Sequence, residues 1–135
     1  MTTTLHHLAL TAVDLEQSGR FLDAVLSQVG YTPAYSSERL RTWIGPSPEI
    51  LLYRCEGQDS SPHTHGRPGL QHAAFAVADR QTVLRVHKAV VVGGWSVVHE
   101  PREYPEYADG YFAVFVACPS GLRLEFCHVP HAPGH

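Results

Sequence analysis

The stretch LHHLALTAVD at residues 5–14 matches the stretch LQHAAFAVAD at residues 70–79 without a gap, 65 residues further along the chain. In each stretch large apolar residues alternate with other residues, which is typical of a strand that is buried on one face. Each stretch ends in an aspartate, Asp14 or Asp79, that is suited to cap the start of a helix. Such self-similarity indicates that the chain contains two copies of one structural unit.

Both aspartates are followed by a segment with the apolar periodicity of a helix and then by glycine. We expect the first helix at 15–29 before Gly30, and the second after Asp79 and before Gly93 and Gly94. Three further strands are expected after each helix, which predicts an α+β fold of two βαβββ modules. The expected strands are about 31–36, 40–45 and 49–55 in the first module and about 95–99, 111–117 and 122–128 in the second.

The last strands of the modules also align. PSPEILLY at 46–53 matches PSGLRLEF at 119–126, which sets Leu52 opposite Glu125 with an offset that has grown to 73. A longer loop at 100–110 absorbs the difference, and such an insertion is well placed to line a site. We therefore expect one domain over 1–135, with module 1 at about 4–56, a linker at 57–69, module 2 at about 70–128 and a tail at 129–135.

Composition narrows the classes of protein that fit. A chain of 135 residues suits a single domain, and no apolar run is long enough for a signal peptide or a membrane span. The three cysteines are an odd number without CxxC spacing, which favours a reduced, cytoplasmic protein. The net charge is −3 and the basic residues are scattered, so we expect neither nucleic acid nor membrane as a partner.

Three polar residues are predicted to face away from the helices. Because side chains alternate across a strand, His7 and His72 fall on the face opposite their apolar neighbours, at equivalent positions of the repeat. Glu125 lies opposite Leu124 and Phe126 in the last strand. A buried carboxylate is costly unless it is paired or bound to a metal.

We therefore predict one divalent metal ion held by His7, His72 and Glu125. Three ligands leave coordination positions open for a substrate, as a catalytic metal requires. Leu52, the repeat equivalent of Glu125, cannot supply a fourth ligand. The alternative is a pocket that only binds ligands, with Glu125 paired to Arg123 or hydrogen-bonded to the histidines.

Several other residues are candidates for contact with a small-molecule substrate. Tyr104, Tyr107 and Tyr111 lie in or beside the long loop, where Tyr111 in particular could offer a phenol to an oxyanion, although plain aromatic packing is an alternative. Arg123 flanks Glu125 and could contact an anion. The weaker candidates are His6, His63, His65 and His128, because they lie in the linker or on other faces.

The quoted motifs, together with GRPGLQHAAFAV at 66–77 and PREYPEYADGYFAVFVACPSGLRLEF at 101–126, resemble the vicinal oxygen chelate superfamily. This resemblance implies a cup-shaped mixed β-sheet with the helices outside. It also implies metal-ligand positions on the first, fourth, fifth and eighth strands, here His7, Leu52, His72 and Glu125. The metal would be Zn, Ni, Mn, Co or Fe(II), and relatives of this length are commonly homodimers.

The resemblance leaves several activities open. Glyoxalase-like lyase or isomerase chemistry on a substrate with two adjacent oxygens fits the length, but glyoxalase I uses a second carboxylate where Leu52 stands. Extradiol dioxygenases hold Fe(II) with two histidines and a glutamate, which matches the ligands better. A fosfomycin-resistance thiol transferase ranks third. A metal-free binding protein of the bleomycin-resistance type is the alternative that performs no chemistry.

Overall fold

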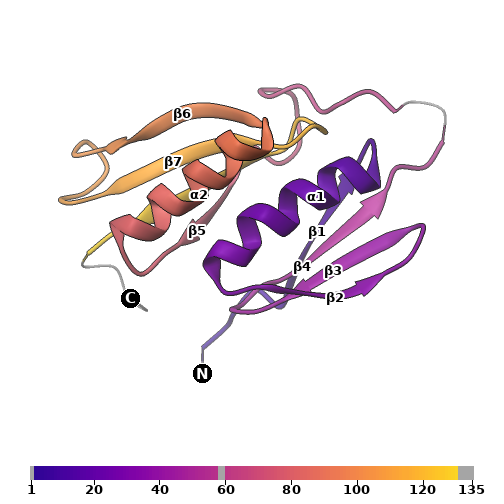
Figure 1. Cartoon of the computed structure of the whole chain (residues 1–135), viewed down its shortest axis with the longest axis horizontal. Helices are drawn as coiled ribbons and strands as arrows, with labels where there is room; N and C mark the ends of the chain where they lie inside the picture. The colour runs from indigo at the N-terminus through magenta and orange to yellow at the C-terminus, as the bar shows by residue number, and fades with distance from the viewer. Residues whose placement is uncertain (1, 58–59, 131–135) are drawn as a thin grey trace.

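The computed structural model describes residues 2–57 and 60–130 as two modules that follow the same order of elements (Figure 1). Within this part of the chain, neither helix is long and apolar enough to cross a membrane. The first module consists of β1 (His7–Ala12), α1 (Leu15–Leu26), the short 3-10 helix η1 (Ser27–Val29), β2 (Thr32–Ser36), β3 (Leu40–Ile44) and β4 (Glu49–Arg54). The second consists of β5 (Ala73–Ala76), α2 (Arg80–Gly93), β6 (Ser96–Glu103), β7 (Phe112–Ala117) and β8 (Arg123–His128).

Each module forms a four-stranded mixed sheet. The strand orders are β1-β4-β3-β2 and β5-β8-β7-β6, with β1 parallel to β4, β5 parallel to β8 and the other pairs antiparallel. The predicted α+β fold of two βαβββ modules is therefore confirmed. In residues 2–57 and 60–130 the strands form two separate sheets, and β1 and β5 are both edge strands.

The predicted helix starts are confirmed, and α2 runs one residue further than expected, to Gly93. Asp14 accepts a hydrogen bond from the Gln17 amide at 3.0 Å, and Asp79 accepts one from the Thr82 amide at 2.8 Å, so both satisfy a free N–H in the first turn. Gly94 ends α2 with a φ of 77°, a conformation that glycine adopts without steric cost. The pattern up to residue 29 is split between α1 and η1.

Two strands differ from the prediction. β5 begins at Ala73, so His72 lies just before the strand and not in it. β6 extends to Glu103, so the first part of the predicted loop 100–110 is strand. Its pairing with β7 shifts register twice, between Val97 and His99 and between His99 and Arg102. Such bulges place extra residues in one strand of a pair, which lets β6 continue past Pro101.

The main apolar core contains residues of both modules. Figure 1 shows α1 and α2 side by side, and the two helices pack against each other. Phe21 of α1 meets Trp95 edge to face, with ring centroids 5.5 Å apart. Ser120, before β8, accepts a hydrogen bond from the Val13 amide at 2.8 Å and contacts the Ser18 hydroxyl at 2.7 Å. These contacts fix the start of β8 relative to the first module.

Candidate active site

The main pocket lies on the face of the second sheet that is turned away from α2, and its volume is about 500 Å³. Register places Ala74, Glu125, Phe115 and His99 in one row across the four strands of this sheet. Residues in such a row point to the same face because neighbouring strands are pleated together. Three of the four, Glu125, Phe115 and His99, line the pocket.

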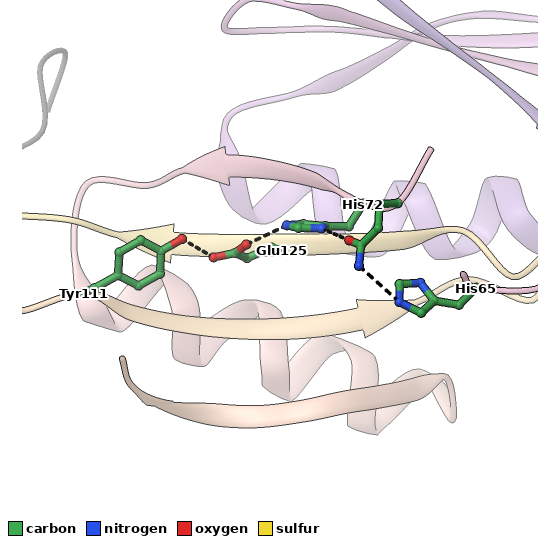
Figure 2. Close-up of polar contacts among 5 residues, drawn as sticks. His65, His72, Tyr111 and Glu125 are labelled. Carbon is green, nitrogen blue, oxygen red and sulfur yellow. Dashed lines mark hydrogen bonds and ion pairs between the residues drawn. The ribbon is translucent and has the colours of Figure 1, made fainter. Parts of the chain in front are cut away.

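Glu125 is the buried polar centre of the pocket, with only 3% of its surface exposed. Its Oε1 atom lies 3.0 Å from Nε2 of His72. Its Oε2 atom accepts a hydrogen bond from the Tyr111 hydroxyl (Figure 2). Both oxygens therefore have partners, as a buried carboxylate requires.

The second ring nitrogen of His72 is fixed by the linker. Nδ1 contacts Oε1 of Gln71, and the Gln71 amide nitrogen lies 3.3 Å from Nε2 of His65 (Figure 2). With the amide in this orientation, its oxygen can only accept, so His72 donates from Nδ1. A neutral His72 then directs the lone pair of Nε2 toward Glu125.

This tautomer has a consequence for the contact between His72 and Glu125. A lone pair on Nε2 and a carboxylate oxygen 3.0 Å away would repel each other unless a positive centre lies between them. That centre can be a shared proton or a metal ion. Two ligand atoms that each lie about 2.1 Å from a metal and meet at a right angle are about 3 Å apart. The pair therefore fits two adjacent positions of a divalent metal.

Burial raises the pKa of Tyr111 far above its usual value of 10.0, and the hydrogen bond to Glu125 adds to this effect. Burial also raises the pKa of the Tyr104 hydroxyl and that of the Cys127 thiol. Tyr111 is therefore a neutral hydrogen-bond donor at physiological pH. It can stabilise a negative charge, but it cannot act as a base there.

His7 lies on the other sheet. It is exposed, and its Nδ1 atom is 2.9 Å from Nδ1 of the neighbouring His6. It is not among the residues that line the pocket with His72 and Glu125. Across residues 2–57 and 60–130, no three His, Cys, Asp or Glu side chains are close enough to hold a metal ion. The structure thus brings two of the three predicted ligands together within one chain.

Several solved structures can be superposed on most of this chain. A candidate glyoxalase from Bacillus halodurans is 26% identical, with a TM-score of 0.79 over 93% of this chain and 95% of that one. A glyoxalase/bleomycin resistance protein/dioxygenase domain from Frankia sp. EAN1pec is 18% identical, with a TM-score of 0.78 over 95% of this chain and 98% of that one. The fold is that of the vicinal oxygen chelate superfamily.

The sequence comparison leaves the activity of the protein unassigned. The uncharacterized protein YqjT of Bacillus subtilis (strain 168) is 26% identical over 122 residues, which is 90% of this chain and 95% of that protein. No family model matches the chain. The comparisons therefore support the fold, and the function has to be argued from the pocket.

Within the vicinal oxygen chelate fold, Leu52 does not reach the pocket. It pairs with Leu10 and is fully buried in the core, whereas Glu125 pairs with Ala74. Because Ala9 is the repeat equivalent of Ala74, its partner Leu51 is the counterpart of Glu125. The turn before β8 is one residue longer than the turn before β4, and a slip of one residue turns a side chain to the other face. We also expected Leu52 to contact the substrate, but its side chain lies in the core; Leu51 holds the register position of Glu125, and neither leucine offers a second carboxylate.

The other predicted contact residues gather around the pocket. Tyr104, Tyr107, Tyr111 and Arg123 all line it. Tyr104 and Tyr107 stack with ring centroids 5.2 Å apart, so aromatic packing and a place in the pocket wall occur together.

Five residues that line the pocket were not among the predicted site residues, namely His65, which was only a weaker candidate, Gln71, His99, Arg102 and Phe115. Arg102 enters because β6 is longer than expected, whereas His99 lies within the expected strand and pairs with Phe115. His65 enters because the linker is held against the turn before β8, where the His63 amide donates to the Ser120 carbonyl at 2.9 Å. Only Gln71, directly before His72, carried a usable signal, because a histidine that binds a metal commonly needs a second partner.

Proposed function

We propose that this protein is a divalent-metal-dependent enzyme with glyoxalase-like lyase or isomerase chemistry. Its substrate would be a small molecule that chelates the metal through adjacent oxygens. The observation that carries the proposal is the 3.0 Å approach of His72 Nε2 to Glu125 Oε1, on a histidine whose Nδ1 is held by Gln71. The metal would be Zn, Ni, Mn, Co or Fe(II), all of which accept imidazole and carboxylate ligands.

His7 would complete the ligand set from a second copy of the chain. It lies on the outer face of an edge strand, and β5, which follows His72, is the corresponding edge of the second sheet. A symmetric homodimer that sets β1 of one copy beside β5 of the other would form a full cup from two half-cups. Each dimer would then contain two equivalent sites.

The bound metal would polarise the substrate oxygens and stabilise a developing negative charge. The side chains of this protein would do the rest. Glu125 is the carboxylate among the described residues that line the pocket, so it is the group able to move a proton between neighbouring carbons. Tyr111 would hold that carboxylate and would remain protonated itself, because its pKa is raised.

A second candidate is an Fe(II) extradiol-type ring-cleaving dioxygenase. Leu51 occupies the position in the first module that corresponds to Glu125. The absence of a carboxylate at this position agrees with a ligand set of two histidines and one glutamate. His99 and His65 also line the pocket and are available as further proton-transfer groups. In this reaction Glu125 would serve as a ligand only.

Metal content of protein purified without a histidine tag tests the proposal. We expect about one divalent ion per chain after supplementation, and His72→Ala should lose it while keeping the circular dichroism spectrum of the wild type. His6→Ala is a matched control for His7→Ala, since the two rings are neighbours and only His7 is an expected ligand. Absence of stoichiometric metal from the wild type would favour a protein that only binds ligands.

Mixing two inactive variants tests whether the site is shared between copies. His7→Ala and His72→Ala should each fail to bind metal alone. After subunit exchange in equal amounts, half of the dimers should be mixed and each should contain one intact site, which restores about a quarter of the wild-type metal content. No restoration would show that His7 does not act across the interface.

Oxygen consumption separates the two reactions. Uptake that depends on Fe(II) and on a catechol would assign the dioxygenase. Turnover of a thiohemiacetal with Zn, Ni, Mn or Co and without oxygen would assign the lyase or isomerase.

A further inference from the structure

The pocket carries more positive than negative charge, although the formal net charge of the chain is −3. Arg102 and Arg123 line it, and Glu125 is the carboxylate that the described lining residues contribute. Both oxygens of Glu125 already have a partner, His72 on one side and the Tyr111 hydroxyl on the other. A ligand that enters the pocket therefore meets a positive surface.

The two arginines differ in what they already contact. Arg102 lies 3.7 Å from the Tyr104 ring centroid and 3.6 Å from a Glu106 oxygen. It also donates to the Glu103 carbonyl at 2.7 Å. Arg102 is therefore held in the pocket wall.

Arg123 is free to bind a ligand. It is partly buried and lies two residues before Glu125, on the same face of β8. Among residues 2–57 and 60–130, no side chain or carbonyl accepts a hydrogen bond from its guanidinium group. A guanidinium that is partly removed from water without a counter-ion favours an anion, and its planar donors match a carboxylate in two parallel hydrogen bonds.

The remaining walls of the pocket are largely aromatic. The rings of Tyr104 and Tyr107 are parallel to within 1°. The Phe115 ring lies 5.6 Å from the His72 ring and 5.4 Å from the His99 ring, measured between centroids. Aromatic side chains pack favourably against an aromatic ligand, either stacked or edge to face.

We propose that the pocket selects small planar aromatic carboxylates, with the carboxylate bound by Arg123 and the ring packed against Phe115 and Tyr107. This inference rests on the proposed function for the claim that such a molecule is a substrate. The recognition itself requires only the described side chains.

Salicylate and salicylamide form a matched pair of probes, because they share the ring and two neighbouring oxygens but differ in charge at neutral pH. By isothermal titration calorimetry, we expect the wild type to prefer salicylate. Arg123→Gln should weaken salicylate binding about tenfold and leave salicylamide unchanged. The salicylate affinity of Arg123→Lys should lie between those of the wild type and Arg123→Gln, since lysine keeps the charge and loses the paired donors. Arg20→Gln is the control, because Arg20 is an exposed residue of α1 and its loss changes the net charge equally.

Three results would overturn the inference. The first is equal affinity of the wild type for both probes, and the second is an equal loss of affinity for both probes in Arg123→Gln. The third is no binding of salicylate. Metal content measured on the same samples tests the proposed function separately. A protein without metal that still prefers salicylate through Arg123 would end the metal proposal and leave this inference standing.

Discussion

The two modules have the same topology, but the sheet faces that are turned away from the helices differ in character. In the second module this face holds Glu125 at 3% exposure, beneath a pocket of about 500 Å³. In the first module the register position of Glu125 is Leu51, and Ile44 and Tyr53 are 54% and 42% exposed. The core faces remain apolar in both modules. The comparison shows that one copy can acquire a polar site without a change in the fold, because the side chains that build the site point away from the core.

The strongest way to test this comparison is to place a carboxylate on each face of β4. Leu52→Glu buries a charge in the core and should lower the free energy of unfolding by about 4 kcal/mol or more. Leu51→Glu copies Glu125 onto the outer face and should cost no more than about 1 kcal/mol, since Leu51 is only half-buried. Urea unfolding followed by circular dichroism measures both. Equal losses would mean that the assigned register of β4 is incorrect.

A smaller effect is expected at the linker residue that fixes His72. Gln71→Leu removes the acceptor of Nδ1–H and should weaken metal binding about 10- to 100-fold, with little change in stability. Gln71→Glu should keep or strengthen binding, because a carboxylate accepts the same hydrogen bond. Competition with a metallochromic chelator gives the affinities.

Gln81→Leu is the control for that series, because this exposed glutamine lies on α2, outside the pocket. Unchanged metal affinity in Gln71→Leu would show that the orientation of His72 is set by other contacts.

The smallest effect concerns alkaline pH. Burial raises the pKa of Tyr111, Tyr31 and Tyr104 above 10.0 in the folded protein, so the unfolded chain loses these protons first as the pH rises. The contribution of these tyrosines to the free energy of unfolding is therefore fully present below pH 10 and declines above it. Tyr111→Phe should reduce this decline, measured by urea unfolding at pH 8, 10 and 11. An identical pH profile in Tyr111→Phe would contradict the raised pKa.

Much of the fold could be predicted from the sequence because the same pattern of strand, helix cap and helix occurs twice. Strand alternation in 5–14 and 70–79 and the capping roles of Asp14 and Asp79 are local properties, and the structure agrees with them. The pairing of His72 with Glu125 was also accessible, since both lie on predicted outer faces. Local patterns sufficed wherever side-chain direction alone decided the outcome.

The parts that the sequence did not reveal depend on register and on long-range packing. The equivalence of Leu52 and Glu125 failed because one extra residue in a turn reverses the direction of every following side chain. His65 enters the pocket through the contact between the linker and Ser120, which has no periodic signal. The position of His7 depends on how two sheets are arranged, and strand patterns do not determine that.

The packing of α1 against α2 also bears on how such a chain could arise. Because the two helices pack against each other within one apolar core, an ancestor of one module would have needed a second copy to complete that core. Such a pair would have had two identical pockets. Once both modules were encoded in one gene, a mutation could alter one pocket and leave the other unchanged, and a difference such as that between Leu51 and Glu125 could arise.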